Sequence, residues 1–131
     1  MQENKKKILI VDDDKFLLNM YFMKFEKNGF EASVATSGAE AIDSLRNGLN
    51  PDIVVMDLIM PTMDGFAMLE NIRKEKLAPN AVYIMLTNQG LLSDINRAKE
   101  LGIHGYIVKA TTIPSEVVEE VTDIYNKNNS K

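Results

Sequence analysis

The chain has 131 residues, a formal net charge of −4 and no cysteine. This length suits one domain with its own core, and the lack of cysteine excludes disulfides, thiol catalysis and thiolate metal sites. The negative charge argues against sequence-independent binding of nucleic acid, which needs clustered Lys and Arg. No apolar run is long enough to cross a membrane, and the start of the chain lacks the pattern of an export signal. We therefore expect a single soluble, cytoplasmic domain over residues 1–131 that binds neither nucleic acid nor membrane directly.

Strands and helices alternate along the first half of the chain. An apolar run that stops on acids predicts a buried strand, and a hydrophobic stripe at helical spacing, closed by Asn28-Gly29, predicts a helix. The alternation of Phe30, Ala32 and Val34 with the residues between them predicts a half-exposed strand at an edge of the sheet. A second helix follows and ends at another Asn-Gly pair. The predicted strands are 7–11 and 30–35, and the predicted helices are 14–28 and 38–47.

The second half of the chain continues the alternation. Residues 53–56 are apolar, mostly β-branched and too few for an isolated buried helix, so they predict a strand covered on both faces. Pro61 and Asp64-Gly65 predict a loop that leads into a helix, and Pro114 suits the first position of the last helix. The predicted strands are 53–56, 81–87 and 105–109, and the predicted helices are 65–76, 91–101 and 114–125, followed by a polar tail at 126–131 that we expect to fray.

This alternation predicts an α/β fold. Its form is a (βα)5, flavodoxin-like, doubly wound parallel sheet with helices on both faces and right-handed crossovers. If strands one and three are neighbours, as in the order 2-1-3-4-5, the order in which strands are added to the sheet reverses between them, and this leaves a crevice at their carboxyl ends. We expect the core to cover residues 6–125.

Polar residues that could bind a metal or take part in a reaction lie at the ends of four of the five predicted strands. Asp12 and Asp13 follow the first strand, Asp57 follows the third, Thr87 ends the fourth and Lys109 ends the fifth. Each has an ordinary explanation when taken singly: the acids as helix caps, Thr87 as a strand residue, Lys109 as a surface charge. Their joint placement at one edge of the sheet is what favours a site.

Three carboxylates crowded into one crevice need a cation, because like charges raise one another's pKa. The donors are hard oxygens without His or Cys, which indicates Mg²⁺, with Mn²⁺ as a substitute and Zn²⁺ disfavoured. Mg²⁺ commonly binds one or two carboxylates together with a phosphoryl oxygen. Asp57 can attack phosphorus as a nucleophile, while Lys109 and the hydroxyl of Thr87 can bind phosphoryl oxygens. The pattern predicts a metal-assisted phosphoacceptor site.

Four segments in register resemble the receiver domain of bacterial two-component response regulators, in the stand-alone, chemotaxis-regulator-like form. The likeness runs from about Lys6 to Tyr125 and rests most on the run that begins at Asp57. The resemblance implies a signalling phosphoacceptor rather than an enzyme. The matching segments are Ile8-Leu-Ile-Val-Asp12-Asp13, Asp57-Leu-Ile-Met-Pro-Thr-Met-Asp-Gly65, Leu86-Thr87 and Tyr106-Ile-Val-Lys109.

The resemblance also implies roles for individual residues. Asp57 would take a phosphoryl group from a sensor histidine kinase or a phosphotransfer protein. Mg²⁺ would be held by Asp13, Asp57 and the backbone carbonyl of Ile59, with Asp12 assisting through water. Thr87 and Lys109 would bind the phosphoryl oxygens, Tyr106 would rotate inward, and the surface of the fourth helix, fifth strand and fifth helix would then bind a different partner, whose identity the sequence does not give.

This chain departs from the family pattern beside the site. Ala110 stands after Lys109 where the family usually has proline, which makes a cis bond costly there. Asn88 is larger than the usual residue and narrows access to the phosphate. Ile59, Asn88 and Gln89 would control the approach of water, and an apolar Ile59 cannot position an attacking water. We therefore expect slow self-dephosphorylation.

Two other function classes compete with this interpretation. A receiver that works through constitutive protein contacts, without phosphorylation, stays open because of Asn88 and Ala110. A phosphatase of the haloacid dehalogenase type would also place two acids after a strand, but it needs a hydroxyl where this chain has Phe16. Flavin binding is disfavoured, because the first loop carries three acids instead of phosphate donors.

Overall fold

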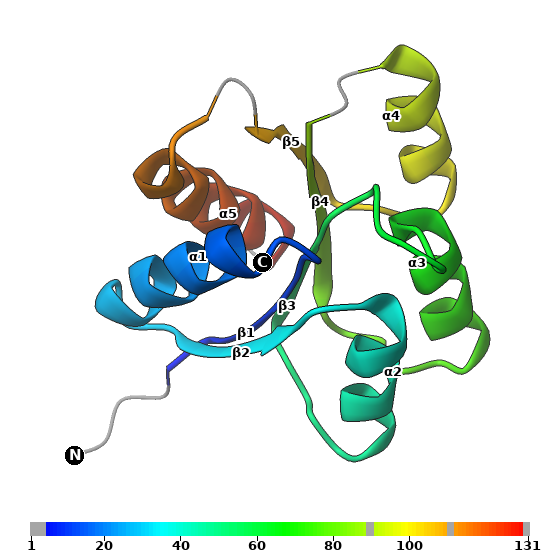
Figure 1. Ribbon diagram of the computed structural model, residues 1–131, viewed down its shortest axis with the longest axis horizontal. Coiled ribbons are helices and arrows are strands. Elements are labelled where there is room, and N and C mark those ends of the chain that lie inside the picture. The colour runs from blue at the N-terminus through cyan, green and yellow to red at the C-terminus, as the bar shows by residue number, and fades with distance from the viewer. Residues whose placement is uncertain (1–4, 89–90, 110–111, 130–131) are drawn as a thin grey trace.

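A computed structural model describes residues 5–88, 91–109 and 112–129 and contains one parallel sheet of five strands in the order β2-β1-β3-β4-β5. Five helices alternate with the strands in this part of the chain, so the predicted α/β fold and strand order are confirmed (Figure 1). The strands are β1 (Lys7–Val11), β2 (Glu31–Ala35), β3 (Ile53–Met56), β4 (Val82–Thr87) and β5 (Gly105–Val108), and the helices are α1 (Lys15–Lys27), α2 (Gly38–Arg46), α3 (Gly65–Lys74), α4 (Leu92–Glu100) and α5 (Pro114–Asn129).

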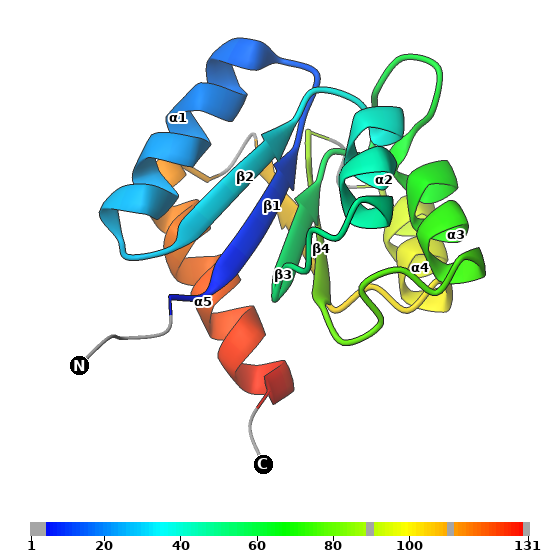
Figure 2. The ribbon, with the colours of Figure 1, turned by 90° about the horizontal axis from the view of Figure 1, so that it is seen from below.

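The helices cover the sheet in two layers. Helices α1 and α5 lie on one face, and α2, α3 and α4 lie on the other (Figures 1 and 2). The alternation of side chains along each strand divides the core accordingly, so that Ile8 and Ile10 face α1 and α5 while Leu9 and Val11 face the opposite layer. Every residue of β3 and β4 is buried, which explains why these strands are continuously apolar.

Strand β2 lies at the edge of the sheet, as predicted, but its burial differs from simple alternation. Val34 is 42% exposed, whereas Ala35, on the opposite face, is fully buried in the core cluster that contains α2 and α3. The reason is position: the outermost strand is covered only in part by the helices beside it. The alternating pattern of residues therefore predicted a strand here correctly, but it did not predict which side chains of the strand are buried.

The C-terminal helix corrects one prediction. Residues 126–129, which we expected to fray, continue α5, while residues 130–131 lie outside the described residues. Two asparagine amides support the last turn: Asn128 donates to the carbonyl of Ile124 at 2.8 Å, and Asn129 donates to the hydroxyl of Tyr125 at 2.8 Å. Because these contacts are hydrogen bonds of polar side chains, the spacing of hydrophobic residues does not predict them. No helix in the described segments combines the length and the apolar character that a membrane span requires.

The register of the sheet places the strand ends beside one another. Val11 pairs with Met56, so Asp12 and Asp57 leave neighbouring strands at the same level. The backbone N–H of Asp57 donates to the carbonyl of Val11 at 3.0 Å, which ties the two ends together. Thr87 likewise pairs with Val108, the residue before Lys109. The crevice expected between strands one and three therefore lies where the polar residues gather.

The loop after Asp57 is held by a close backbone approach at Gly65. The N–H of Gly65 donates to the carbonyl of Leu58 at 2.8 Å, and Asp64 caps α3 by accepting from the N–H of Ala67 at 2.8 Å. A Cβ atom at position 65 would lie 2.6 Å from the carbonyl oxygen of Asp57. Only glycine lets the start of α3 pack this closely beneath the site.

We expect Gly65→Ala to destabilise the chain by about 1–3 kcal/mol, because backbone atoms rather than a movable side chain oppose the new methyl group. Gly38→Ala is the matched control. Gly38 is also the first residue of its helix, but its Cβ would meet the flexible thioether of Met63 at 2.8 Å, which can move away. Urea unfolding of both variants measures the difference, and equal losses would contradict this account.

Candidate phosphoacceptor site

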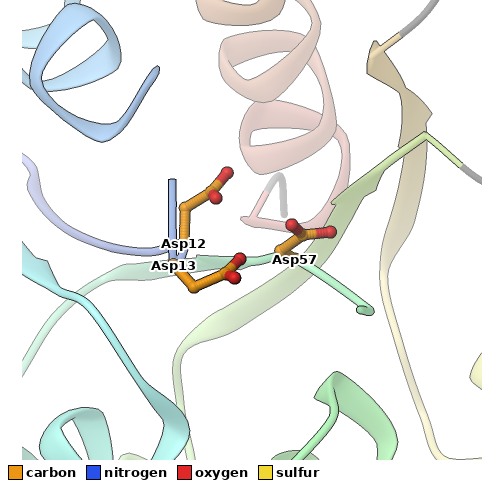
Figure 3. Close-up of side chains that lie close together, drawn as sticks. All are labelled: Asp12, Asp13 and Asp57. Atoms are coloured by element: carbon orange, nitrogen blue, oxygen red, sulfur yellow. The ribbon is translucent and has the colours of Figure 1, made fainter. Parts of the chain in front are cut away.

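Three acids meet at the carboxyl ends of β1 and β3. Asp12, Asp13 and Asp57 each offer an oxygen, and these three atoms lie within 4.8 Å of one another (Figure 3). Asp12 and Asp57 are buried, at 2% and 8% exposure, while Asp13 is open to solvent. All the donors are hard oxygens, so this set fits a divalent cation of the Mg²⁺ type and lacks the nitrogen and sulfur ligands typical of zinc.

The third acid of the run, Asp14, has a different task. Its Oδ1 accepts from the backbone N–H groups of Phe16 and Leu17, both at 3.1 Å, and so caps α1. The N–H of Asp14 in turn donates to Oδ1 of Asp12 at 2.9 Å. The turn between β1 and α1 therefore orients the buried carboxylate of Asp12 through the backbone.

Lys109 supplies the positive charge of the site. Its Nζ donates to Oδ2 of Asp12 at 2.6 Å and to Oδ2 of Asp57 at 3.1 Å, with only 7% of its side chain exposed. Burial by itself would lower the pKa of Lys109, but the hydrogen bond that Lys109 donates to Asp12 and the charge of Asp57 outweigh burial, and the pKa is raised. The ammonium group therefore stays charged and bridges both buried carboxylates.

The pKa of the Asp57 carboxyl depends on opposing effects. Burial raises its pKa, the charge of Lys109 lowers it, and the nearby charge of Asp12 raises it again, with a net rise. Its Oδ1 receives a long hydrogen bond of 3.4 Å from the N–H of Ile59. This environment thus disfavours the ionised form of Asp57, and an added cation would stabilise it.

A cavity of about 370 Å³ opens over these groups. Of the residues that line it, Thr87 is fully buried, whereas Ile59 is 57% exposed and Asn88 is exposed as well. Sequence reasoning missed Leu17 as a lining residue; its position one turn into a helix that starts at the site was the available signal. The cavity is lined by Asp12, Asp13, Asp14, Leu17, Asp57, Ile59, Thr87, Asn88 and Lys109.

Among the described residues, the predicted switch residue Tyr106 does not line this cavity. Tyr106 is half-buried in β5 and packs against the core cluster shared with α3 and α4. Its burial, together with the charges of Asp94 and Asp57, raises the pKa of its hydroxyl. Gln89 and Ala110 lie outside the described residues, so the expectations about water access at position 89 and the peptide bond after Lys109 stay predictions.

Comparison with known proteins settles the family. Residues 8–122 match the family model of the response regulator receiver domain. The chain belongs to this family. Receiver domains are signalling phosphoacceptors rather than classical enzymes, and this receiver carries the acidic site at the carboxyl edge of its sheet.

Relatives of two lengths resemble this receiver. It is 38% identical to the chemotaxis protein CheY of Thermotoga maritima, over 91% of this chain and 97% of that protein. It is 33% identical to the probable transcriptional regulator ycf27 of Cyanophora paradoxa, over 97% of this chain but 51% of that protein. The receiver thus spans about half the length of the ycf27 relatives it matches.

Solved structures agree with this assignment. A CheY-like receiver domain protein of Methanospirillum hungatei superposes with a TM-score of 0.84 at 26% identity, covering 95% of this chain and 97% of that chain. The receiver domain of the Francisella response regulator 1452 gives a TM-score of 0.82 at 30% identity, covering 95% of this chain and all of that one. The fold is therefore shared over nearly the whole receiver.

We expect Asp57→Asn to raise the free energy of unfolding at neutral pH by on the order of 1 kcal/mol, in the absence of divalent metal. The pKa of Asp57 is raised in the folded chain above its ordinary value of 3.8, so the ionised carboxylate costs stability at any pH above the folded pKa. That cost fades as the pH falls towards the unfolded value, and the advantage of the variant should fade with it.

Urea unfolding at a series of pH values measures this difference. Asp123→Asn, which removes the same charge from an exposed position on α5, is the control and should show no comparable gain. An equal gain in both variants would assign the effect to net charge instead of to the buried site.

Proposed function

We propose that this receiver takes a phosphoryl group onto the carboxylate of Asp57 from the phosphohistidine of a sensor histidine kinase or phosphotransfer protein. A carboxylate oxygen of Asp57 forms a bond to phosphorus as the bond from phosphorus to the imidazole nitrogen breaks, and the imidazole takes up a proton. The observation that carries the proposal is the bridge from Lys109 to Asp12 and Asp57, which puts a charged ammonium beside the proposed nucleophile.

A divalent cation completes the charge balance in this proposal. Asp13, Asp57 and the backbone carbonyl of Ile59 would hold Mg²⁺, or Mn²⁺ in its place, with Asp12 assisting through water. The close approach of three hard oxygens supports this assignment. When bound, the cation supplies positive charge that offsets the phosphoryl oxygens and the crowded carboxylates. Lys109 and the buried hydroxyl of Thr87 would bind the remaining phosphoryl oxygens.

Signal output would follow from a change in contacts within the receiver. We propose that Thr87 shifts towards the phosphoryl group, that Tyr106 turns inward, and that the surface formed by α4, β5 and α5 then binds a different protein partner. The half-buried position of Tyr106, between core and surface, supports such a rearrangement. Phosphorylation acts in this scheme only through contacts that differ between the two states.

The setting proposed for this reaction is the cytoplasm, where a sensor kinase delivers the phosphoryl group. Neither nucleic acid nor membrane is proposed as a direct ligand, in keeping with the net charge of −4.

Intact-protein mass after incubation with Mg²⁺ and acetyl phosphate tests the proposal. We expect one added phosphoryl group in the wild-type chain and none without metal. Asp57→Asn should give no adduct, while Asp123→Asn, at an exposed position away from the site, should be modified as the wild type is. A folded wild-type chain that gives no adduct with acetyl phosphate or with a phosphorylated phosphotransfer protein, and binds no metal, would favour the phosphorylation-independent interaction module.

The exposed side chain of Ile59 at the mouth of the cavity predicts a long-lived phosphoryl group. An apolar side chain there cannot orient a water for attack on phosphorus, so Ile59→Asn should speed the loss of phosphate by roughly tenfold, a modest part of what a positioned polar group can contribute. The time course of phosphate release gives both rates.

Met23→Asn, which changes an exposed apolar residue of α1 outside the cavity, should leave the rate of phosphate loss unchanged. Rapid loss from the wild-type chain, or equal rates in the wild type and Ile59→Asn, would contradict the role of position 59.

A further inference from the structure

The outer side of β2 carries backbone groups that point away from the sheet. Glu31 donates its N–H to Lys6 at 2.8 Å, and Ala35 accepts from the N–H of Asp12 at 3.1 Å, so these two residues direct their backbone towards β1. Alternate residues of a strand direct their hydrogen-bonding groups to opposite sides. Ala32, Val34 and Thr36 therefore direct theirs outward; we call these three residues the β2 edge.

Two glutamates occupy donors of the β2 edge. Oε2 of Glu26, in the last turn of α1, accepts from the N–H of Ala32 at 2.9 Å. Oε1 of Glu40, in the first turn of α2, accepts from the N–H of Thr36 at 2.6 Å and from its hydroxyl at 3.3 Å. Both glutamates are exposed, and fixing such long side chains costs conformational entropy. Carboxylates from two different helices thus close the two ends of one edge.

The two glutamate contacts are placed symmetrically about Val34. The closed donors lie two residues before and two residues after Val34, whose side chain is 42% exposed. An antiparallel pair with a two-fold axis at Val34 would set Val34 opposite its counterpart and Ala32 opposite Thr36 of a second copy. The β2 edge is therefore complementary to itself, and Glu26 and Glu40 hold the donors of Ala32 and Thr36 that flank Val34 in this pairing.

We propose that the β2 edge is a strand-pairing surface for a second copy of this chain, and that Glu26 and Glu40 keep it closed. With both carboxylates withdrawn, two copies join β2 to β2 and form one continuous sheet. Figure 2 shows β2 as the outermost strand on its side of the sheet, beyond β1. Exposed edges that are left open commonly add strands from other chains, so the two glutamates act as a specific barrier.

Glu26→Ala/Glu40→Ala tests this proposal by light scattering of the eluting protein over a range of concentrations. We expect the wild-type chain to elute with the mass of one copy, and the double variant to approach twice that mass as its concentration rises. Glu31→Ala/Glu119→Ala is the matched control: it removes two exposed acids, one of them on β2 itself, without freeing an outward donor. That control should keep the mass of one copy.

A third substitution locates the contact. Val34→Lys, added to Glu26→Ala/Glu40→Ala, places a charge at the centre of the pairing and should restore the mass of one copy. If the double variant loses its helical circular dichroism, Glu26→Ala alone carries the test: it frees Ala32 from an exposed position at the end of α1, and because Glu40 still holds Thr36, its mass should double only at a higher protein concentration. A folded variant that keeps the mass of one copy at millimolar concentration, or a doubled mass that Val34→Lys does not reverse, overturns the proposal.

Discussion

The buried bridge between Lys109 and two aspartates is the interaction on which the carboxyl edge of the sheet depends. Asp12 and Asp57 leave neighbouring strands from within the core, and each would be costly there as an isolated charge. A single ammonium from the end of β5 contacts both. Lys109 is 97 positions from Asp12 and 52 positions from Asp57 in the sequence, so this bridge joins distant parts of the chain. Removing Lys109 alone would leave two carboxylates buried without a cation.

Lys109 does not fully compensate the negative charge of the carboxylates, and this incomplete compensation suits the site to bind a cation or a phosphoryl group. One positive charge faces three carboxylates, and burial together with the charge of Asp12 keeps the pKa of Asp57 raised despite its contact with Lys109. Stability would be better served by an uncharged side chain at position 57. The fold tolerates the acid because the surrounding strands are apolar and fully buried, so that packing of β3 and β4 offsets the local cost. A cation or a phosphoryl group can then enter a site that is already organised.

Much of this arrangement could be predicted from the sequence. The strand pattern gave the order of elements, and parallel topology alone brought Asp12, Asp57, Thr87 and Lys109 to one edge. What escaped prediction depends on contacts between elements. Hydrophobic spacing contains no information on the pairing of Lys109 with Asp12, nor on the exposure of Val34, which follows from incomplete cover at the edge of the sheet. The helical turn at 126–129 likewise rests on side-chain amides.

The site and the outer edge of the sheet are connected through one strand. The N–H of Asp12 donates to the carbonyl of Ala35, so β2 helps to position the first acid of the site. The next residue, Thr36, is held on its other side by Glu40. A second chain that displaced Glu40 would therefore act on a backbone segment one hydrogen bond away from Asp12. Closure of the β2 edge and the geometry of the acidic site are thus parts of the same local structure, and the glutamates that keep the chain from pairing also stabilise the strand that supports the site.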